Sequence, residues 1–192
     1  VEWKTELDNK KFIQIGNQFI VFEGENGLNI LHQHRAHQRV LFEYYQKVFE
    51  NGKTESQQLA FTQILSFSNT DFLLLKQIKK TLRNLGFGFD LKKENQIEIT
   101  GIPTECKNED LENIFDEILQ QEKNNEKLKV STKERIAKVL AKSLAIKSGK
   151  KLEIQEINLL VNNLFACNLP TVCPNGNPAI INIAFNDISK YF

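Results

Sequence analysis

All three histidines of the chain, His32, His34 and His37, lie within six consecutive positions. Imidazole is the commonest protein ligand for zinc and related ions, so this spacing raises a metal site as the first hypothesis. The alternative is structural, with ring nitrogens that hydrogen-bond to backbone or water at the end of a secondary-structure element. Both interpretations stay open from these residues alone.

A strand pair followed by a helix must position these histidines. Residues 11–33 are rich in apolar residues and are interrupted by Glu25-Asn26-Gly27, which is typical of a hairpin turn. A helix from about residue 35 to 49 is predicted by apolar residues that recur every four positions: Ala36, Val40, Tyr44 and Val48. The first two histidines are therefore expected at a strand end, and His37 in the first helical turn, where backbone N–H groups are free.

Strands and helices alternate along the rest of the chain. Strands are expected at residues 59–67, 87–91, 96–100 and 179–185, and helices at 71–85, 111–119, 131–149, 153–165 and 187–192. Ser131 and Glu134 have the spacing of a capping box, which predicts a helix start at that point. A polar linker is expected at residues 120–129.

Composition restricts the class of protein. With 192 residues, 41% of them hydrophobic and 26% charged, the chain is long enough for one sizeable core or two small ones. It has no apolar run near the ~20 residues that span a bilayer and no leader-like start, so we expect a cytoplasmic protein without membrane contact. The cysteines are odd in number and widely spread, which favours reduced thiols: Cys106, Cys167 and Cys173. Because methionine is absent, we expect the chain to be part of a longer product.

Two separated stretches carry a family resemblance. QFIVFEGENGLNILHQHRAHQRVLFE (18–43) and CPNGNP (173–178) resemble the carboxy-terminal domain of the MutL family of DNA mismatch repair proteins. The family motifs read D-Q-H-A-x-x-E-x-x-x-x-E and C-P-H-G-R-P. The resemblance implies an α/β fold with mixed sheets packed with helices and two subdomains. Residues 1–60 and 150–192 would form the dimerisation subdomain, and residues 61–149 an inserted external subdomain.

In family members that cut DNA, the two motifs hold divalent metal ions. Three residues of this chain match ligand or motif positions: His34, Glu43 and Cys173. The leading Asp, the first Glu and the loop His of those motifs are replaced by His32, Gln38 and Asn175. Amides are far weaker ligands than carboxylate or imidazole, so we expect no metal, no cofactor and no nuclease activity. The alternative is an endonuclease with zinc or manganese on rearranged ligands, taken from His32, His34, His37 and Cys173.

The resemblance also implies a homodimer, for which an apolar face is needed. Candidates are Leu159, Leu160 and the strand at 179–185, each of which fits an intramolecular core equally well.

Residues 127–151 carry nine basic residues and one acid, Glu134. On the helix expected there, Arg135, Lys138 and Lys142 share one side, which fits non-specific contact with DNA phosphate. The alternative is a solvated lysine face.

The segment QQLAF (57–61) resembles the short peptides that dock on the replication sliding clamp, with Gln57, Leu59 and Phe61 as anchors. The alternative is an ordinary edge strand whose Leu59 and Phe61 side chains belong to the core. The resemblance further implies mismatch recognition and excision proteins as partners of the full-length protein.

Overall fold

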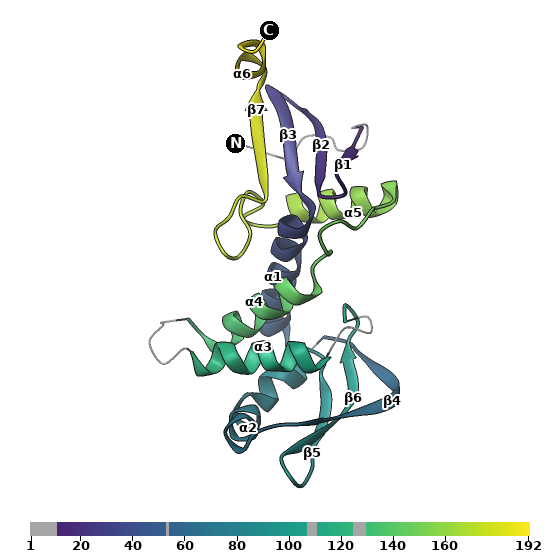
Figure 1. Cartoon of the computed structure of the whole chain (residues 1–192), viewed down its shortest axis with the longest axis vertical. Coiled ribbons are helices and arrows are strands. Elements are labelled where there is room, and N and C mark those ends of the chain that lie inside the picture. The colour runs from purple at the N-terminus through teal and green to yellow at the C-terminus, as the bar shows by residue number, and fades with distance from the viewer. Residues whose placement is uncertain (1–10, 53, 107–110, 125–129) are drawn as a thin grey trace. The chain divides into compact units, whose positions relative to one another are not determined.

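The computed structural model describes residues 11–52, 54–106, 111–124 and 130–192 (Figure 1). The chain forms two compact units. The first unit contains the described residues up to Glu43 together with Ala145–Phe192, and the second contains Tyr44–Leu144. These boundaries differ from residues 60 and 150, where the sequence placed them, so the whole QQLAF segment lies in the second unit. Of the expected polar linker, residues 125–129 lie outside the described part of the chain.

The first unit contains an antiparallel sheet in the order β1-β2-β3-β7. Its strands are β1 (Ile13–Ile15), β2 (Phe19–Gly24), β3 (Gly27–His32) and β7 (Ile180–Ala184). The β2–β3 hairpin turns at Glu25 and Asn26, as the sequence predicts. Glycine is required at position 27, because a Cβ atom there would lie 2.1 Å from the carbonyl oxygen of Ile183 on β7. This close approach lets the last strand pair with the hairpin.

One face of this sheet packs on α5 (Ile154–Phe165) and the beginning of α1 (Gln33–Asn51). Alternate residues of β2 and β3 point into this core, as a strand period of two requires. The core residues are Ile20, Phe22, Leu31, Ala36, Leu152, Ile157, Leu160, Val161, Leu164 and Ile180. In Figure 1, α5 lies behind the strands. Among the described residues, no helix covers the opposite face.

The second unit contains a three-stranded antiparallel sheet in the order β4-β6-β5. Its strands are β4 (Ser56–Ser66), β5 (Gly88–Leu91) and β6 (Gln96–Pro103). The helices of this unit are α2 (Asn69–Asn84), α3 (Leu111–Lys123) and α4 (Thr132–Leu144). Phe115 of α3 lies between Phe87 and Phe89, with ring centroids 5.5 and 5.9 Å away, so α3 forms the centre of this core.

Local chemistry sets the helix starts. The Ser68 hydroxyl accepts the Asp71 N–H (3.1 Å) at the start of α2. The Ser131 hydroxyl accepts the Glu134 N–H (3.2 Å), as the capping-box spacing predicts for α4. The Glu156 carboxylate accepts the Glu153 N–H (2.9 Å) at the start of α5. The α/β class is confirmed, with antiparallel pairing in both sheets.

Several elements differ from those expected. Residues 11–33 form three strands and not two, β4 begins three residues earlier, and α3 continues to Lys123, into the expected polar linker. The helix α4 ends at Leu144 and not near residue 149. The last helix, α6 (Phe185–Ser189), begins directly after β7, two residues earlier than expected. None of the described helices is long and apolar enough to cross a membrane.

Candidate functional site

His34 has both ring nitrogens engaged. Its Nδ1–H donates to the carbonyl oxygen of Ile146 at 2.7 Å, and its Nε2 accepts from the Gln38 side-chain amide at 3.0 Å. Gln38 follows His34 by one helical turn of α1, so the two side chains meet on one face. The nitrogen lone pair that a metal would need is therefore used by Gln38.

His37 holds the other side of the same backbone segment. Its Nδ1 accepts the Ile146 N–H at 2.9 Å. Burial, with smaller contributions from His34 and Lys150, lowers the pKa of His37 to about 4. The ring is therefore neutral near pH 7 and remains a hydrogen-bond acceptor.

His32 lies at the end of β3, with its Nε2 3.2 Å from the Gln18 side-chain amide. Burial lowers the pKa of His32, and the positive charge of Arg35 lowers it further. Each of the three histidines thus has a structural hydrogen-bond partner, and His34 and His37 share Ile146.

Gln33, which the sequence did not single out, organises the strand-to-helix junction. Its amide donates to the carbonyl oxygens of Asn17 (2.6 Å) and Lys150 (3.0 Å) and accepts from the Gln14 amide (2.7 Å). Gln14 also accepts the Leu152 N–H at 3.1 Å. Gln33 is fully buried, and a buried amide needs such partners. The only signal in the sequence is its position between His32 and His34, where the strand is expected to end.

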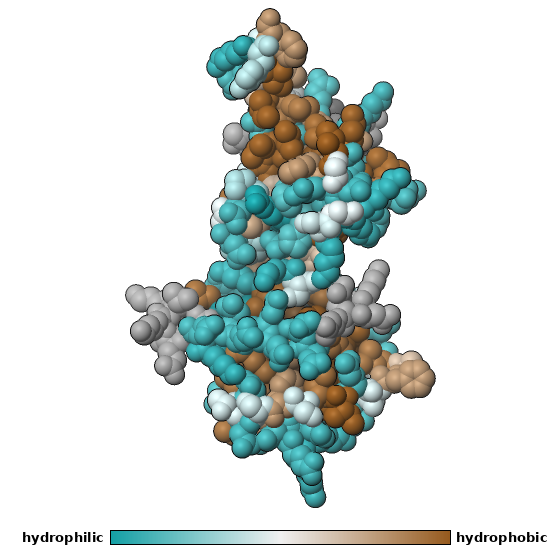
Figure 2. All heavy atoms as spheres, in the orientation of Figure 1, coloured by the Kyte–Doolittle hydropathy of each residue, from teal (hydrophilic) through white to brown (hydrophobic). Residues whose placement is uncertain are grey.

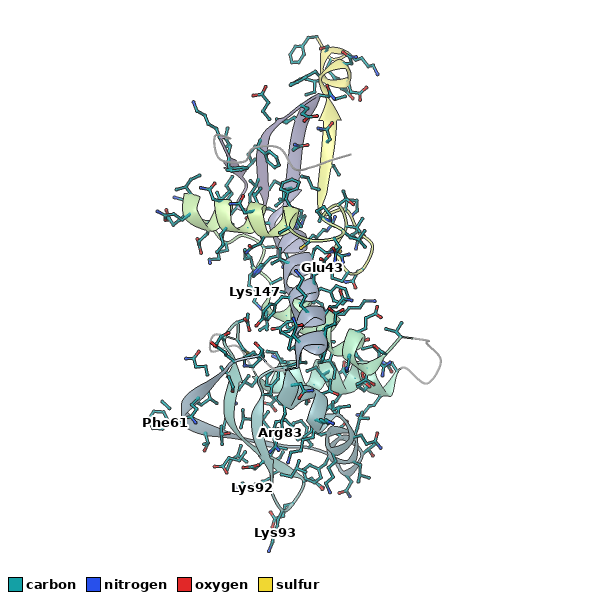
Figure 3. The ribbon with its side chains drawn as sticks, turned by 180° about the vertical axis from the view of Figure 1, so that it is seen from behind. Glu43, Phe61, Arg83, Lys92, Lys93 and Lys147 are labelled. Carbon is teal, nitrogen blue, oxygen red and sulfur yellow. The ribbon has the colours of Figure 1, made fainter. Side chains whose placement is uncertain are left out.

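Glu43 is engaged by the backbone after α5. Its carboxylate accepts the N–H groups of Asn168 (2.7 Å) and Leu169 (3.2 Å) and lies 3.5 Å from the Arg39 guanidinium. Arg39 also donates to the carbonyl oxygen of Val172 at 2.6 Å. Figure 3 shows Glu43 on α1 beside this loop. The buried Arg39–Glu43 pair therefore fastens the loop that leads to Cys173.

Cys173 begins a tight loop. Its N–H donates to the Asn177 carbonyl (2.8 Å), and its carbonyl accepts the Gly176 N–H (2.9 Å). Gly176 has φ +82°, which favours glycine. Arg35 donates to the Pro178 carbonyl at 3.2 Å, so the structure does bring the two sequence motifs together. They meet through arginine and backbone contacts.

The donor set does not fit a divalent metal centre. Within the described residues, no three side chains among His, Cys, Asp and Glu are arranged to hold an ion. The Glu43 carboxylate is used by two N–H groups and an arginine, and the Gln38 amide donates to Nε2 of His34.

The open face of the first-unit sheet carries an apolar row. Ile13, Val21, Ile30 and Ile181 are successive cross-strand partners on β1, β2, β3 and β7. Ile13 is 61% exposed and Ile181 47%. Figure 2 shows apolar side chains gathered over these strands. Of the expected dimer residues, Leu160 is in the core at 4% exposure, whereas Leu159 is 63% exposed on α5.

The strand β4 lies at a sheet edge and contains a large bulge. Gln58 pairs with Gly101 and Gln63 with Ile99, so residues 59–62 face Thr100 alone. Phe61 is 90% exposed and projects from this segment (Figure 3), while Leu59 is half-buried. The alternative that placed Phe61 in the core is therefore wrong.

The three cations expected to contact DNA all have acidic partners. Arg135 is paired with Glu122 at 2.6 Å, Lys138 with Glu134 at 2.9 Å and Lys142 with Glu117 at 3.6 Å. The Arg135 pair is largely buried. This side of α4 therefore presents much less net positive charge than its sequence suggests.

Comparison with known proteins gives consistent matches. The model of the family described as "MutL C terminal dimerisation domain" matches residues 12–152. The chain is similar to the DNA mismatch repair protein MutL of Prosthecochloris aestuarii, with 34% identity over 96% of this chain and 30% of the relative. It is 33% identical to MutL of Flavobacterium johnsoniae over 98% of this chain and 30% of the relative. The chain thus spans about 30% of the length of these curated relatives.

Proposed function

The chain belongs to the family of MutL C-terminal dimerisation domains, and from this premise we propose that it joins two copies through its open sheet face and presents β4 to the replication sliding clamp. Dimerisation is the property that names the family. The surface that performs it and the clamp as partner are the new parts of the proposal.

The apolar row of Ile13, Val21, Ile30 and Ile181 supports the assignment of the dimer surface. Side chains in direct register across four strands form a continuous strip, and a strip of this kind is self-complementary about a two-fold axis. Its burial in a second copy removes exposed isoleucine side chains from water, which stabilises association.

The dimer surface is tested by light scattering at micromolar concentration. The wild-type chain should give twice its mass of 22.2 kDa, and Ile181→Glu should give the monomer mass, because it buries an unpaired charge. Phe61→Glu is the matched control, since it places the same charge at an exposed apolar position of the other unit. A dimeric Ile181→Glu protein would place the interface elsewhere, and a monomeric wild type would contradict dimerisation itself.

The exposed Phe61 supports clamp docking. A phenylalanine that is 90% exposed gains little from the fold, whereas an apolar pocket on a partner would bury it. The bulge leaves residues 59–62 outside the regular ladder with β6, so an extended segment is accessible at a sheet edge. Gln57 is also exposed, and in the proposed complex its side-chain amide would hydrogen-bond at the rim of such a pocket.

Clamp affinity is measured for wild type, Phe61→Ala and Ile64→Ala. Ile64 is a matched control because it is apolar, 59% exposed and on the same strand, but outside the motif. Phe61→Ala should weaken binding about 30-fold or more, as expected for an interface anchor. Equal loss with Ile64→Ala would indicate a general apolar surface and not the motif.

We also propose that this domain does not cut DNA, since its donor set does not fit the metal site of nicking relatives. Supercoiled plasmid incubated with the domain, manganese and loaded clamp should stay intact. Nicking that His34→Ala abolishes would support the alternative, an endonuclease with rearranged ligands.

A further inference from the structure

The helix α2 carries a row of cations along one border of its buried face. At 100° per residue, Lys76, Lys79, Lys80 and Arg83 fall within an arc of about 100°. The adjoining arc contains the core residues Leu75, Ile78 and Leu82, while the buried Phe72 lies within the cation arc, one turn before Lys76. The only acid of the helix, Asp71, lies in its first turn and is paired with Lys123 at 2.5 Å.

This border faces the edge strand β5. Arg83 donates to the Phe89 carbonyl at 3.0 Å, and the Lys79 ammonium lies 5.8 Å from the Phe89 ring centroid. After β5, the chain enters the turn that carries Lys92 and Lys93. Figure 3 shows these two lysine side chains projecting from the turn. The cations of α2 and the turn therefore belong to one side of the unit.

Most of this charge is not neutralised by the protein. Within the described ranges, Lys76, Lys79, Lys80 and Lys93 make no ion pair, whereas the cations predicted on α4 are paired. Arg83 and Lys92 do have partners, Asp90 at 3.1 Å and Glu98 at 2.6 Å. The Arg83–Asp90 pair is largely solvent-exposed, so it adds little stability and is exchanged at little cost.

We propose that this α2–β5 basic surface, composed of Lys76, Lys79, Lys80, Arg83, Lys92 and Lys93, is a non-specific contact site for the phosphate backbone of duplex DNA. It goes beyond dimerisation and clamp docking and depends on neither of them: it rests on the cations of α2 that have no ion pair and on the membership of a DNA repair family. The row from Lys76 to Arg83 is about 10 Å long, so its cations can contact a few phosphates of a duplex, which carries one charge per about 1.7 Å of its axis.

The chemistry of the surface favours backbone contact over base recognition. Lysine ammonium groups on flexible side chains pair with phosphate as point charges and carry no sequence information. The nearest ring on α2, Phe72, is buried beneath the Lys76 ammonium at 4.7 Å, so it is not available to stack on a base.

The test is the salt dependence of binding to a short labelled DNA duplex, followed by fluorescence anisotropy with the full chain. The variant is Lys76→Gln with Lys79→Gln and Lys80→Gln. Each lost phosphate contact lowers the slope of log affinity against log salt by about 0.9, so the triple variant should lower it by about 2 to 3. Its affinity at low salt should fall at least about tenfold.

The matched control removes the same charge from α4, with Lys133→Gln, Lys138→Gln and Lys142→Gln, and should leave the slope nearly unchanged. An unchanged slope in the α2 variant, an equal fall in the α4 variant, or a wild type that binds no duplex at low salt would each overturn the site. Loss of clamp affinity with DNA binding intact would show that the surface serves a protein partner instead.

Further measurements separate folding from function. Thermal melts should coincide for all variants, and Lys80→Gln alone, at an exposed position without an ion pair, should still lower the slope by about 0.9. Light scattering and clamp affinity should remain those of wild type in the α2 variant. If they do while the DNA slope also stays unchanged, the DNA site fails and the proposed function stands.

Discussion

At the residue scale, two of the three imidazoles that suggested a metal site, those of His34 and His37, bind one backbone residue. His34 donates to the carbonyl of Ile146 and His37 accepts its N–H, so two rings one turn apart on α1 satisfy both polar groups of one peptide residue. Such groups are costly to leave unpaired when buried. His34 and His37 are three residues apart, a spacing that could bring two ligands to a metal. In this structure the same spacing lets both rings hydrogen-bond to Ile146.

This arrangement predicts a pH dependence of stability. The pKa of His37 is lowered from 6.5 to about 4 in the fold, so the unfolded chain takes up a proton first as the pH falls. The contribution of His37 to stability is complete above about pH 6.5 and is lost progressively between pH 6.5 and 4. Urea unfolding across this range should show stability rising with pH, and His37→Gln, which does not titrate, should flatten that slope. An equal slope in the variant would exclude His37 as the source.

Glu43 gives a second prediction at this scale. Glu43→Gln removes the charge that pairs with buried Arg39 and weakens the acceptor of two N–H groups, so it should cost about 3 kcal/mol of unfolding free energy. Chemical denaturation gives this value directly. The control is Glu50→Gln, at an exposed position of the same helix, which should change stability by less than about 0.5 kcal/mol.

The sequence could identify the substituted motif positions but not the partners of the side chains. Gln38 and Asn175 are visible as amides without any structure, and the loss of ligands that they suggest is a prediction from the family resemblance. The role of Glu43 depends on backbone groups 125 and 126 residues away, and that of His34 on one 112 residues away. Contacts of this length follow from the packing of α1 against the end of the chain, which no local pattern encodes.

At the element scale, β4 combines an exposed bulge with a paired end. Phe61→Ala should change the unfolding free energy by less than about 0.5 kcal/mol, because the side chain has lost little water contact. Leu65→Ala on the same strand should cost about 2 to 5 kcal/mol, since Leu65 is buried. Thermal or urea unfolding of the two variants distinguishes them. A strongly destabilised Phe61→Ala protein would mean that this side chain packs inward.

Periodicity predicted most elements because one face of each is apolar, but it did not predict where α4 ends. Apolar residues continue beyond Leu144 to Ala145 and Ile146, so the helical periodicity predicts that the helix continues past Leu144. In the structure, the polar groups of Ile146 bond to His34 and His37 and not to a further helical turn. A tertiary hydrogen bond thus overrides the local pattern.

At the scale of the whole molecule, the net charge of a sequence segment does not match the charge that its surface presents after ion pairing. The basic segment 127–151 suggested a DNA contact because the acids paired with Arg135 and Lys142, Glu122 and Glu117, belong to α3 and lie outside the segment. The helix α2 has fewer cations in sequence, yet Lys76, Lys79 and Lys80 have no ion-pair partner among the residues described. Net charge of a segment is therefore a weak predictor of a binding surface until the neighbouring helix is known.

The division into two units predicts that residues 44–144 fold without the rest of the chain. They form a continuous segment with their own sheet and a core centred on Phe115, which contacts Phe87 and Phe89. The apolar row from Ile13 to Ile181 lies in the other unit, so the excised fragment should melt cooperatively and be monomeric by light scattering. It should keep clamp binding that depends on Phe61. A fragment that dimerises would place the interface in the second unit, and an unfolded fragment would mean that α1 needs its first turns in the other unit to form.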